Sequence, residues 1–508
     1  MPSFVETYVQ QLSDAIGFDV ETLNYTLGLF LCYPLGMIMN MIPYGTMRHL
    51  FSFLLGAFLL QFTLGVQWIH QMITCVVAYS MFMVLPRKTC TMAVPVFVMA
   101  YCVLGHLHRQ YINYLGWDLD FTGAQMVLTQ KLYMLAYNLY DGECLAKGKD
   151  NRASKKCASF ALKEMPSFIE FLGYNFCFAS VLSGPAFEYS TYCGACDGSL
   201  MYDKDGKPKG KIPSNVWPTL RPFLISLLNL AVFVELGANF PLLDPSDPQK
   251  ATPVILTAEF LSKPMVYRYL YMWVGLLCVR QKYYFAWMNA EGANNVWYAG
   301  FEGFDENGNA KGWENSSNVD IWSFETAPNL QTLTKEWNKK TSLWLTKYVY
   351  IRTNGSLMAV YAMSAFWHGC KSTCSLLEVR SYIENLTRLS RNFLEPRSNT
   401  LTHLLHFIVY PGYYLFFLSV PLLTFCERLA KKKISPYFSS EKWSLYGIAG
   451  MLTTSLFAEY MVAAFVFLAL DRSIAAWKSF YFFGHIFPFV AYPVLMVLPS
   501  PAKKDKKE

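Results

Sequence analysis

A histidine and an asparagine offer the clearest catalytic chemistry in this sequence. His368 ends an apolar run in the segment 365–369, AFWHG, and an imidazole can act as a general base because it titrates close to neutral pH. Asn338 follows Trp337 in a polar stretch, where its amide could donate to a developing oxyanion or orient a substrate. Taken alone, a histidine beside Trp367 is more often a core residue whose hydrogen bonds are all made within the protein. The alternative interpretation of Asn338 is an ordinary helix cap.

The composition places these two residues in a membrane protein. Of the 508 residues, 53% are hydrophobic, 17% aromatic and 16% charged, whereas a soluble domain carries about a quarter charged residues. The aromatic content excludes a disordered chain. The net charge of +7 comes from Lys and Arg in short loops between apolar segments, so we expect no nucleic-acid partner. One polytopic domain over 1–508 is therefore predicted.

Apolar stretches of about 20 residues predict about ten membrane-spanning helices. The candidate segments are 25–43, 48–66, 67–86, 91–108, 168–185, 221–243, 266–288, 356–368, 403–425, 445–470 and 478–498. The segment 124–140 is shorter and more polar, and 356–368 cannot cross alone, so we expect half-spans or helices buried in the protein. The predicted fold class is an all-α, polytopic transmembrane helical bundle.

Several other polar residues are weaker candidates for function. Glu459 and His485 lie inside predicted spans, which makes each a functional-site hypothesis, although the sequence indicates no partner for either. His106 and His108 end an apolar run and are predicted to lie at the membrane interface.

The 13 cysteines indicate a mostly reduced protein, because most lie inside apolar runs where thiols behave as small hydrophobes. Cys193 and Cys196 form a CxxC pair. No second pair or histidine pair stands at zinc-finger spacing, so we predict an ordinary loop and no metal site.

The C-terminus carries a targeting pattern. In the basic tail 499–508, Lys504 and Lys506 stand fifth and third from the end, the arrangement of dilysine retrieval signals that coatomer recognises. The basic loop 428–442, two spans earlier, is predicted to be cytosolic by the positive-inside rule. Together they predict a multi-pass protein of the endoplasmic reticulum membrane with a cytosolic C-terminus.

Seven sequence motifs together carry a family resemblance. They are 120–131 (DFTGAQMVLTQK), 137–142 (YNLYDG), 183–189 (SGPAFEY), 282–285 with 291–293 (KYYF and EGA), 317–321 (SNVDI), 336–345 (EWNKKTSLWL) and 366–369 (FWHG). With them the sequence resembles the membrane-bound O-acyltransferase family, and within it the lysophospholipid acyltransferases of broad headgroup range from fungi and plants. The resemblance implies that His368 is the catalytic histidine and Asn338 the second catalytic residue.

The reaction that the resemblance implies is transfer of a fatty acyl group from acyl-CoA to the free hydroxyl of a lysophospholipid. Acyl-CoA is then a substrate, and no metal or bound cofactor is expected. Two amphiphilic substrates imply a membrane-buried catalytic chamber. The absence of a G-x-S-x-G motif disfavours a serine hydrolase. Two alternatives stay open: the same fold acting on a sterol, a diacylglycerol or a protein, and a lipid transporter without chemistry.

One segment departs from the family pattern. In the family, the Trp-His-Gly triplet runs almost directly into a Pro-Gly-Tyr-Tyr segment, and both are implied to support the catalytic motifs. Here Trp367 and Gly369 are separated from Pro411, Gly412 and Tyr413 by an insertion, the 39 residues 370–408. Its several charged residues would be costly beside a buried catalytic group. We predict a retained intron, a splice variant or a gene-model error; the alternative is a genuine loop at the chamber mouth.

Overall fold

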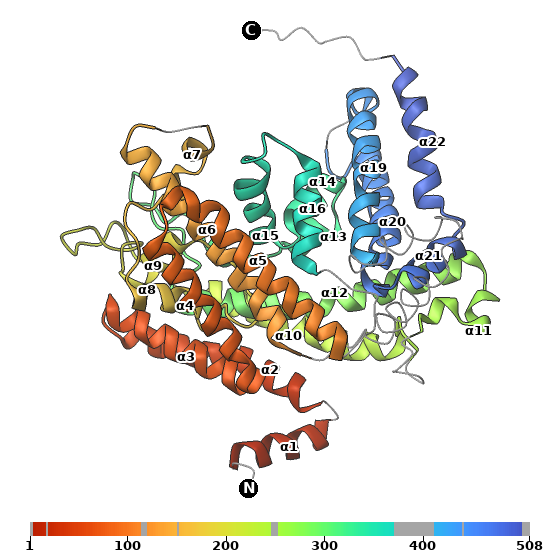
Figure 1. Cartoon of the computed structure of the whole chain (residues 1–508). Helices are drawn as coiled ribbons and strands as arrows, with labels where there is room; N and C mark the ends of the chain where they lie inside the picture. Colours follow the sequence, from red (N-terminus) through yellow and green to blue (C-terminus); the bar gives the residue numbers. More distant parts are fainter. Residues whose placement is uncertain are drawn as a thin grey trace, which may run out of the picture.

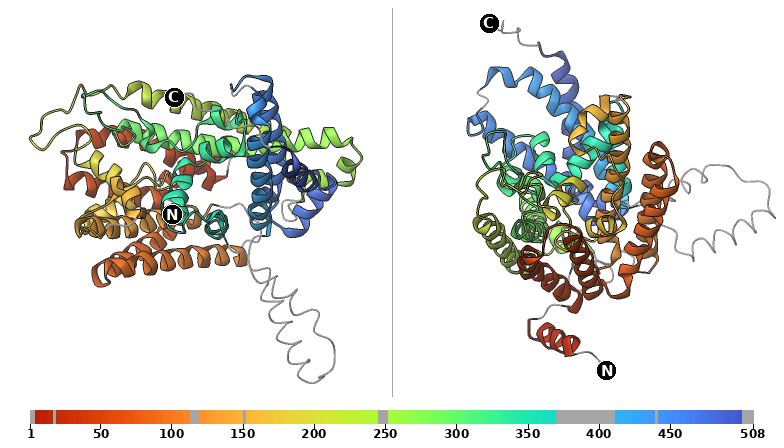
Figure 2. Two further views of the ribbon diagram at one scale, coloured as in Figure 1. Left: turned by 90° about the horizontal axis from the view of Figure 1, so that it is seen from above. Right: turned by 90° about the vertical axis from the view of Figure 1, so that its left-hand side faces the viewer.

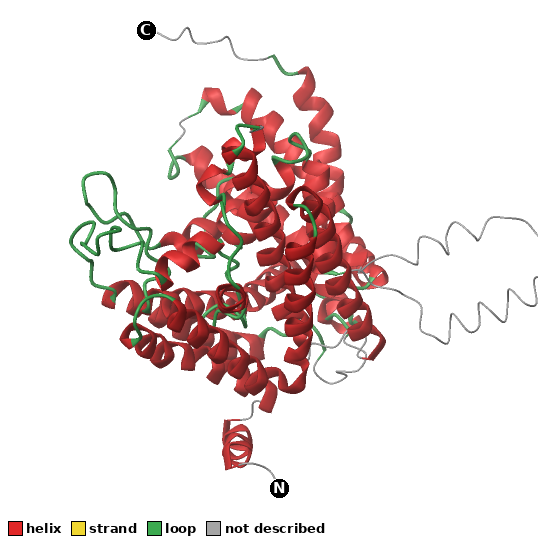
Figure 3. Ribbon diagram, turned by 60° about the vertical axis from the view of Figure 1, so that its left-hand side comes forward, coloured by secondary structure: helices red, strands yellow, loops and turns green. Residues whose placement is uncertain are grey.

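The computed structural model of this protein consists of helices joined by loops (Figure 3). It describes residues 4–16, 19–112, 119–149, 152–244, 252–369, 411–438 and 441–499. Within these ranges the only β-type pairing is three isolated bridges. The all-α prediction is confirmed.

The N-terminal helices form one group, from which α1 stands apart below the start of α2 (Figure 1). They are α1 (Phe4–Ile16), α2 (Val20–Met41), α3 (Thr46–Leu64), α4 (Ile69–Val84), α5 (Arg87–Ile112), α6 (Phe121–Ala146), α7 (Arg152–Lys156), α8 (Phe168–Asn175) and α9 (Tyr189–Cys196). Side chains of α2 to α6, α8 and α9 share one large hydrophobic core. Within it α6 is buried on every side, as expected for 124–140.

The remaining helices form the centre and the opposite side of the molecule. They are α10 (Val216–Asn239), α11 (Ala258–Leu261), α12 (Met265–Val296), α13 (Ile321–Glu325), α14 (Leu330–Glu336), α15 (Lys339–Trp344), α16 (Leu357–His368), α19 (Pro411–Lys433), α20 (Leu445–Phe467), α21 (Leu470–Ser479) and α22 (Phe483–Val497). The short helices α13 to α16 lie between the N-terminal group and the blue helices α19 to α22 (Figure 1). The view from above, on the left of Figure 2, shows the same separation.

Helix α12 connects the two groups. Its 32 residues extend about 48 Å, and it packs against α10. Near its start, Trp273 Nε1 donates to Ser455 Oγ of α20 at 3.0 Å. Near its end, the main-chain oxygen of Val296 accepts from Asn40 Nδ2 of α2 at 2.7 Å. Elements at opposite sides of the protein are therefore fixed to one rigid helix.

Five helical stretches in the described part are long and apolar enough to cross a membrane. They are Val20–Met41, Thr46–Val84, Arg87–Ile112, Val216–Asn239 and Leu445–Phe467. The bent pair α21 and α22, which meet at 69°, would make a sixth. The protein is thus a polytopic membrane protein, but a count of ten spans is not confirmed.

The predicted span 168–185 is wrong, because α8 ends at Asn175 and the chain then turns inside the core. Asn175 Nδ2 donates to the main-chain oxygen of Phe171 at 2.9 Å. Lys131 of α6 donates to the main-chain oxygen of Tyr174 at 2.9 Å. The Lys131 ammonium thus satisfies a main-chain oxygen that a longer helix would otherwise have paired.

Candidate active site

His368 is the last residue of α16, and its ring lies among aromatic side chains of other helices. The helix begins at an N-cap, Ser356, whose Oγ accepts from the Ala359 main-chain nitrogen at 3.2 Å, and its 12 residues are too few to span a membrane. The imidazole centroid is 5.9 Å from the ring of Phe417 on α19 and 5.1 Å from that of Phe465 on α20. The half-buried imidazole thus sits where three helices meet.

Trp367 anchors the end of α16 on the opposite side. Its Nε1 donates to the main-chain oxygen of Met126 on α6 at 3.0 Å, and its ring lies 6.0 Å from that of Trp344 on α15. These contacts fix the backbone from which the His368 imidazole projects.

Asn338 stands at the start of α15 in the left-handed conformation, with φ 48° and ψ 54°. Glycine adopts this region most readily, and asparagine does so more readily than most other residues. Asn338 occupies the N-cap position of α15, but its side chain makes no capping hydrogen bond. Instead Asn318 holds the turn: its main-chain oxygen accepts from Lys339 N at 2.8 Å and its Oδ1 from Lys340 N at 3.1 Å. The side-chain amide of Asn338 is therefore not used to cap α15.

Trp337 is held by aromatic rings from α12 and α13. Its ring centroid lies 4.8 Å from that of Trp287, 5.8 Å from that of Tyr284 and 5.0 Å from that of Phe324. The motifs 282–285 and 336–345 therefore meet at this residue, and the main chain entering Asn338 is firmly packed.

Helix α15 links the two candidate catalytic residues. Asn338 precedes its first residue, and Trp344 at its end packs on Trp367, next to His368. Six helical residues span about 9 Å. In the middle of α15, Thr341 Oγ1 accepts from Gln130 Nε2 of α6 at 2.9 Å. Helix α15 thus runs from Asn338 to a residue that packs beside the end of α16, and α6 contacts it midway.

Three buried side chains form a closed hydrogen-bonded ring beside this region. Asn138 Nδ2 donates to Glu188 Oε2 at 2.8 Å, and the Tyr348 hydroxyl lies 2.7 Å from Asn138 Oδ1 and 2.8 Å from Glu188 Oε1. A hydroxyl has one proton to donate, and Asn138 Oδ1 only accepts. The ring closes when Tyr348 donates to Asn138 and a protonated Glu188 donates to Tyr348. Burial favours this neutral carboxyl, because it raises the pKa of Glu188 to about 7.

A buried ion pair fixes the same segment one turn further along. Arg352 Nη1 donates to Asp141 Oδ1 at 2.9 Å and Nη2 to Oδ2 at 2.5 Å. Ser154 Oγ also donates to Asp141 Oδ1, at 2.7 Å. The motif 137–142 therefore supplies two anchors, Asn138 and Asp141, for the chain that joins α15 to α16.

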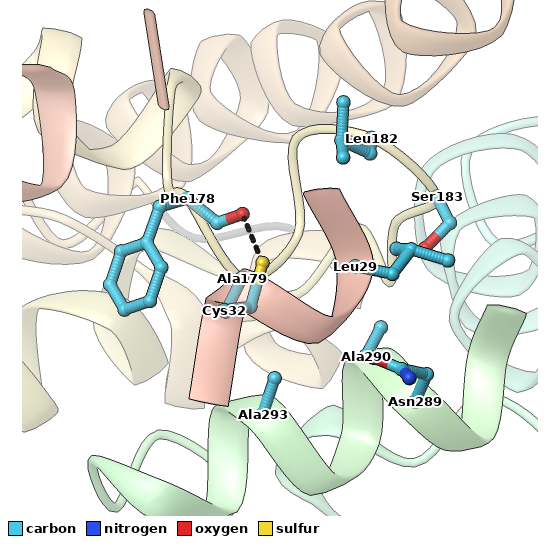
Figure 4. Close-up of a pocket in the computed structure, with 9 residues that line it drawn as sticks. All are labelled: Leu29, Cys32, Phe178, Ala179, Leu182, Ser183, Asn289, Ala290 and Ala293. Atoms are coloured by element: carbon cyan, nitrogen blue, oxygen red, sulfur yellow. Dashed lines mark hydrogen bonds between the residues drawn. The ribbon is translucent and has the colours of Figure 1, made fainter. Parts of the chain in front are cut away.

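A narrow crevice opens between α2, α12 and the segment 178–183 (Figure 4). Its lining is mostly apolar, with Leu29, Leu182 and Ala293 among the residues that form it. Asn289 lines it as well, fully buried, with neither Nδ2 nor Oδ1 hydrogen bonded. An unsatisfied buried amide is costly, which marks Asn289 as a polar group that sequence reasoning missed.

The other sequence candidates have partners in the structure. Arg280 Nη1 donates to Glu459, and Arg280 Nε donates to Glu325 Oε1 at 3.0 Å. His485 contacts Ser419 Oγ and the Tyr460 hydroxyl, both at 2.9 Å. These contacts join helices and supply the partners that the sequence did not indicate for Glu459 and His485.

Two further sequence interpretations need correction. His106 is not interfacial but buried, at 6% exposure, with its Nε2 3.5 Å from Cys102 Sγ on the same helix. Cys193 and Cys196 lie on helix α9, not in a loop. The eleven cysteines of the described part are free, in agreement with a reduced chain.

Parts of the predicted site lie beyond what the structure describes. Pro411, Gly412 and Tyr413 begin α19, but their side chains are outside the described set. The segment 370–408 and the tail 500–508 lie outside the described residues.

Comparison with known proteins identifies the family. Residues 88–383, more than half of the chain, match the model of the membrane-bound O-acyltransferase family, MBOAT. A similar protein, membrane-bound glycerophospholipid O-acyltransferase 2 of Gallus gallus, is 28% identical over 99% of this chain and 89% of its own length.

Two further relatives extend this likeness to human and fungal proteins. Membrane-bound glycerophospholipid O-acyltransferase 1 of Homo sapiens is 28% identical over 97% of this chain and 92% of its own length. The lysophospholipid acyltransferase of Schizosaccharomyces pombe is 26% identical over 100% and 92%. The chain belongs to the membrane-bound O-acyltransferase family.

Proposed function

We propose that this protein is an acyl-CoA-dependent O-acyltransferase that acylates the free hydroxyl of a lysophospholipid, in phospholipid synthesis and remodelling. The observation that carries the proposal is the convergence of sequence motifs from α6, α12 and α15 around Asn338 and Trp367. The names of the similar full-length relatives favour a lysophospholipid as acceptor over a sterol, a diacylglycerol or a protein.

In this proposal His368 is the general base. Its imidazole accepts the proton of the acceptor hydroxyl as that oxygen attacks the thioester carbonyl of acyl-CoA. A tetrahedral intermediate forms and collapses, the C–S bond breaks, and His368 returns the proton to the departing CoA sulfur. A positioned base of this kind contributes roughly 10²- to 10⁴-fold to the rate.

Asn338 is the oxyanion donor in the same step. Its side chain does not cap α15, so Nδ2 is available to donate to the carbonyl oxygen as negative charge develops there. The left-handed backbone and the packed Trp337 ring hold this amide in place before the substrate binds. Loss of one such donor costs roughly 10²- to 10³-fold in kcat. Acyl-CoA enters as a substrate, and the chemistry calls on no bound cofactor.

The segment 370–408 is proposed to be dispensable, as a splice or gene-model feature. Phe417 follows the Pro-Gly-Tyr-Tyr segment at the distance that the family pattern leads us to expect. Its ring centroid lies 5.9 Å from that of His368, although the 39 residues 370–408 separate the two halves of the motif. This adjacency supports the view that a chain without the insertion would rejoin here with little rearrangement.

The protein is further proposed to reside in the endoplasmic reticulum membrane with its C-terminus in the cytosol. Support comes from Lys504 and Lys506 in the tail, the positions that coatomer reads in dilysine signals, and from the basic residues that close α19, Lys431 to Lys433.

The test is acyl transfer from labelled oleoyl-CoA to a panel of acceptors: lysophosphatidylcholine, lysophosphatidylethanolamine, cholesterol, diacylglycerol and a peptide. Three chains are compared in membranes: the full chain, the chain lacking 370–408, and the latter with His368→Ala. We expect lysophospholipid acylation by the shortened chain and its loss with His368→Ala.

The other outcomes separate the alternatives. Activity of the full chain would make 370–408 a tolerated loop and refute its assignment as an artefact. A preference for cholesterol, diacylglycerol or the peptide would show that the acceptor is not a lysophospholipid. Inactivity of all three chains toward every acceptor would contradict the enzyme assignment and favour a lipid transporter.

A further inference from the structure

A second cluster of reactive side chains lies away from His368 and Asn338, where α3 meets α9. His49 comes from the first turn of α3, Cys193 from the last turn of α9, and Asp197 is the C-cap of α9. Cys193 and Asp197 are four residues apart and share one helix face. The His49, Cys193 and Asp197 donor atoms all lie within 4.8 Å of one another.

The spacing of these atoms is close to that of a tetrahedral metal site. His49 Nε2 is 3.2 Å from Asp197 Oδ1, and Cys193 Sγ is 3.0 Å from Asp197 Oδ2. Zinc bonds of about 2.0 to 2.3 Å place tetrahedral ligands roughly 3.3 to 3.7 Å apart. Small side-chain adjustments would therefore open the centre of the cluster to an ion.

The surroundings of His49 suit metal ligation. Its other ring nitrogen, Nδ1, lies 3.1 Å from the Tyr192 hydroxyl. A partner at that position fixes the ring and leaves Nε2 to face a metal, as outer partners do in known zinc sites. The His49 side chain is 1% exposed, whereas that of Asp197 is 41% exposed. An ion would thus have one buried ligand and a route from solvent.

The backbone around the cluster is already fixed. Gly45 N, just before α3, donates to the main-chain oxygen of Cys196 at 3.0 Å. Arg48 Nη1 donates to the main-chain oxygen of Ala195 at 3.2 Å. Because these bonds hold the start of α3 against the end of α9, binding an ion costs little ordering of the chain.

We propose that His49, Cys193 and Asp197 bind one Zn²⁺ ion, with water as the fourth ligand, and that this ion clamps α3 to α9. The mixed nitrogen, sulfur and oxygen donor set suits zinc and excludes the hard ions Mg²⁺ and Ca²⁺, which prefer oxygen ligands alone. One thiolate and one carboxylate balance the charge of the ion. The proposal is independent of the acyltransferase assignment.

Binding is a ligand exchange without redox change. Burial raises the pKa of the Cys193 thiol to about 12, so the thiol is protonated in the absence of an ion. The Zn–S bond forms as the S–H proton leaves to solvent. The ion replaces the Nε2 proton that is directed at Asp197 Oδ1 in its absence, this proton leaves to solvent or moves to Nδ1, and the bound imidazole carries one proton, on Nδ1, directed at the Tyr192 hydroxyl.

The test uses the full chain purified in detergent. Bound zinc is measured per protein, and the stripped protein is titrated with Co²⁺, whose thiolate charge-transfer absorption reports a Co–S bond. The variants are Cys193→Ser, Asp197→Asn and Tyr192→Phe. Cys196→Ser is the matched control, because Cys196 is a buried thiol of the same helix outside the cluster. Size-exclusion elution in detergent identifies any variant that fails to fold.

We expect about one zinc per chain in the wild type and in Cys196→Ser, loss of zinc and of the Co²⁺ absorption in Cys193→Ser, and weakening by roughly 10- to 100-fold in Tyr192→Phe. The proposal is overturned if wild-type protein holds no more zinc than Cys193→Ser and gives no Co²⁺ charge-transfer band. A Cys193–Cys196 disulfide in the purified protein would overturn it equally, since no thiolate would remain.

Discussion

The ring of Asn138, Glu188 and Tyr348 makes a prediction that depends on a single proton. If Glu188 is neutral, Glu188→Gln preserves all three hydrogen bonds: the new Nε2 donates to Tyr348, and the new Oε1 accepts from Asn138. Glu188→Ala instead leaves the Asn138 amide and the Tyr348 hydroxyl short of partners. Each orphaned buried group costs about 1 to 3 kcal/mol, so the alanine variant should be destabilised at every pH.

The size of the expected difference in stability follows from the raised pKa of Glu188. Burial raises the pKa of Glu188 from 4.5 to about 7, so between these values the folded protein holds a proton that the unfolded chain has lost. The contribution of Glu188 to the free energy of unfolding is therefore greatest below pH 4.5, and it falls as the pH rises to 7. At about 1.4 kcal/mol per pH unit, the loss is about 3 kcal/mol. Glutamine has no proton to lose, so Glu188→Gln escapes this loss.

The assay is thermal unfolding of the detergent-purified wild type and both variants between pH 4.5 and pH 8. The stability of Glu188→Gln relative to the wild type should rise across this range and level off above pH 7, while other titrating groups cancel in the difference. A pH-independent difference, or a glutamine variant as unstable as the alanine variant, would refute a neutral Glu188 and the ring built on it.

Three further substitutions test the packing of the site, each by thermal unfolding. Gly142→Ala should destabilise by about 1 to 3 kcal/mol, because a Cβ there would lie 1.9 Å from the main-chain oxygen of Leu162; Gly123→Ala in the same helix has open space and should be neutral or stabilising. Equal effects of the two would contradict this packing. Arg352→Ala strands the buried Asp141 carboxylate and should cost about 3 to 5 kcal/mol; a loss under 1 kcal/mol would mean that water reaches Asp141. Asn289→Leu removes an unsatisfied amide and should stabilise by about 1 to 3 kcal/mol, whereas destabilisation would reveal a partner for Asn289.

Patterns local in the sequence predicted much of this architecture. The all-α fold, the buried helix over 124–140 and the short helix ending at His368 follow from hydropathy and length. The prediction of a membrane span over 168–185 was wrong, because apolar content alone does not distinguish a span from a segment buried in the protein core. There the chain turns after α8 with its backbone paired to neighbours such as Lys131.

Contacts between distant residues could not be predicted from spacing. Arg280 lies 179 residues from its partner Glu459, and His49 lies 148 residues from Asp197. Glu188 and Asn138 stood in motifs that the resemblance had marked, but nothing in those motifs indicated that they meet at Tyr348. Folding alone brings such groups together, so their chemistry appears only in the structure.

The central claim is that His368 and Asn338 perform acyl transfer, and the most direct test is the turnover of purified His368→Ala and Asn338→Ala with oleoyl-CoA and lysophosphatidylcholine. Each variant is made in the active form of the chain, with or without 370–408. His108→Ala, an exposed histidine of α5, is the matched control. We predict that kcat falls roughly 10²- to 10⁴-fold in the first variant and roughly 10²- to 10³-fold in the second, while thermal stability and the control stay close to wild type. Retention of more than about a tenth of wild-type kcat by His368→Ala, in folded protein, would contradict a role as general base.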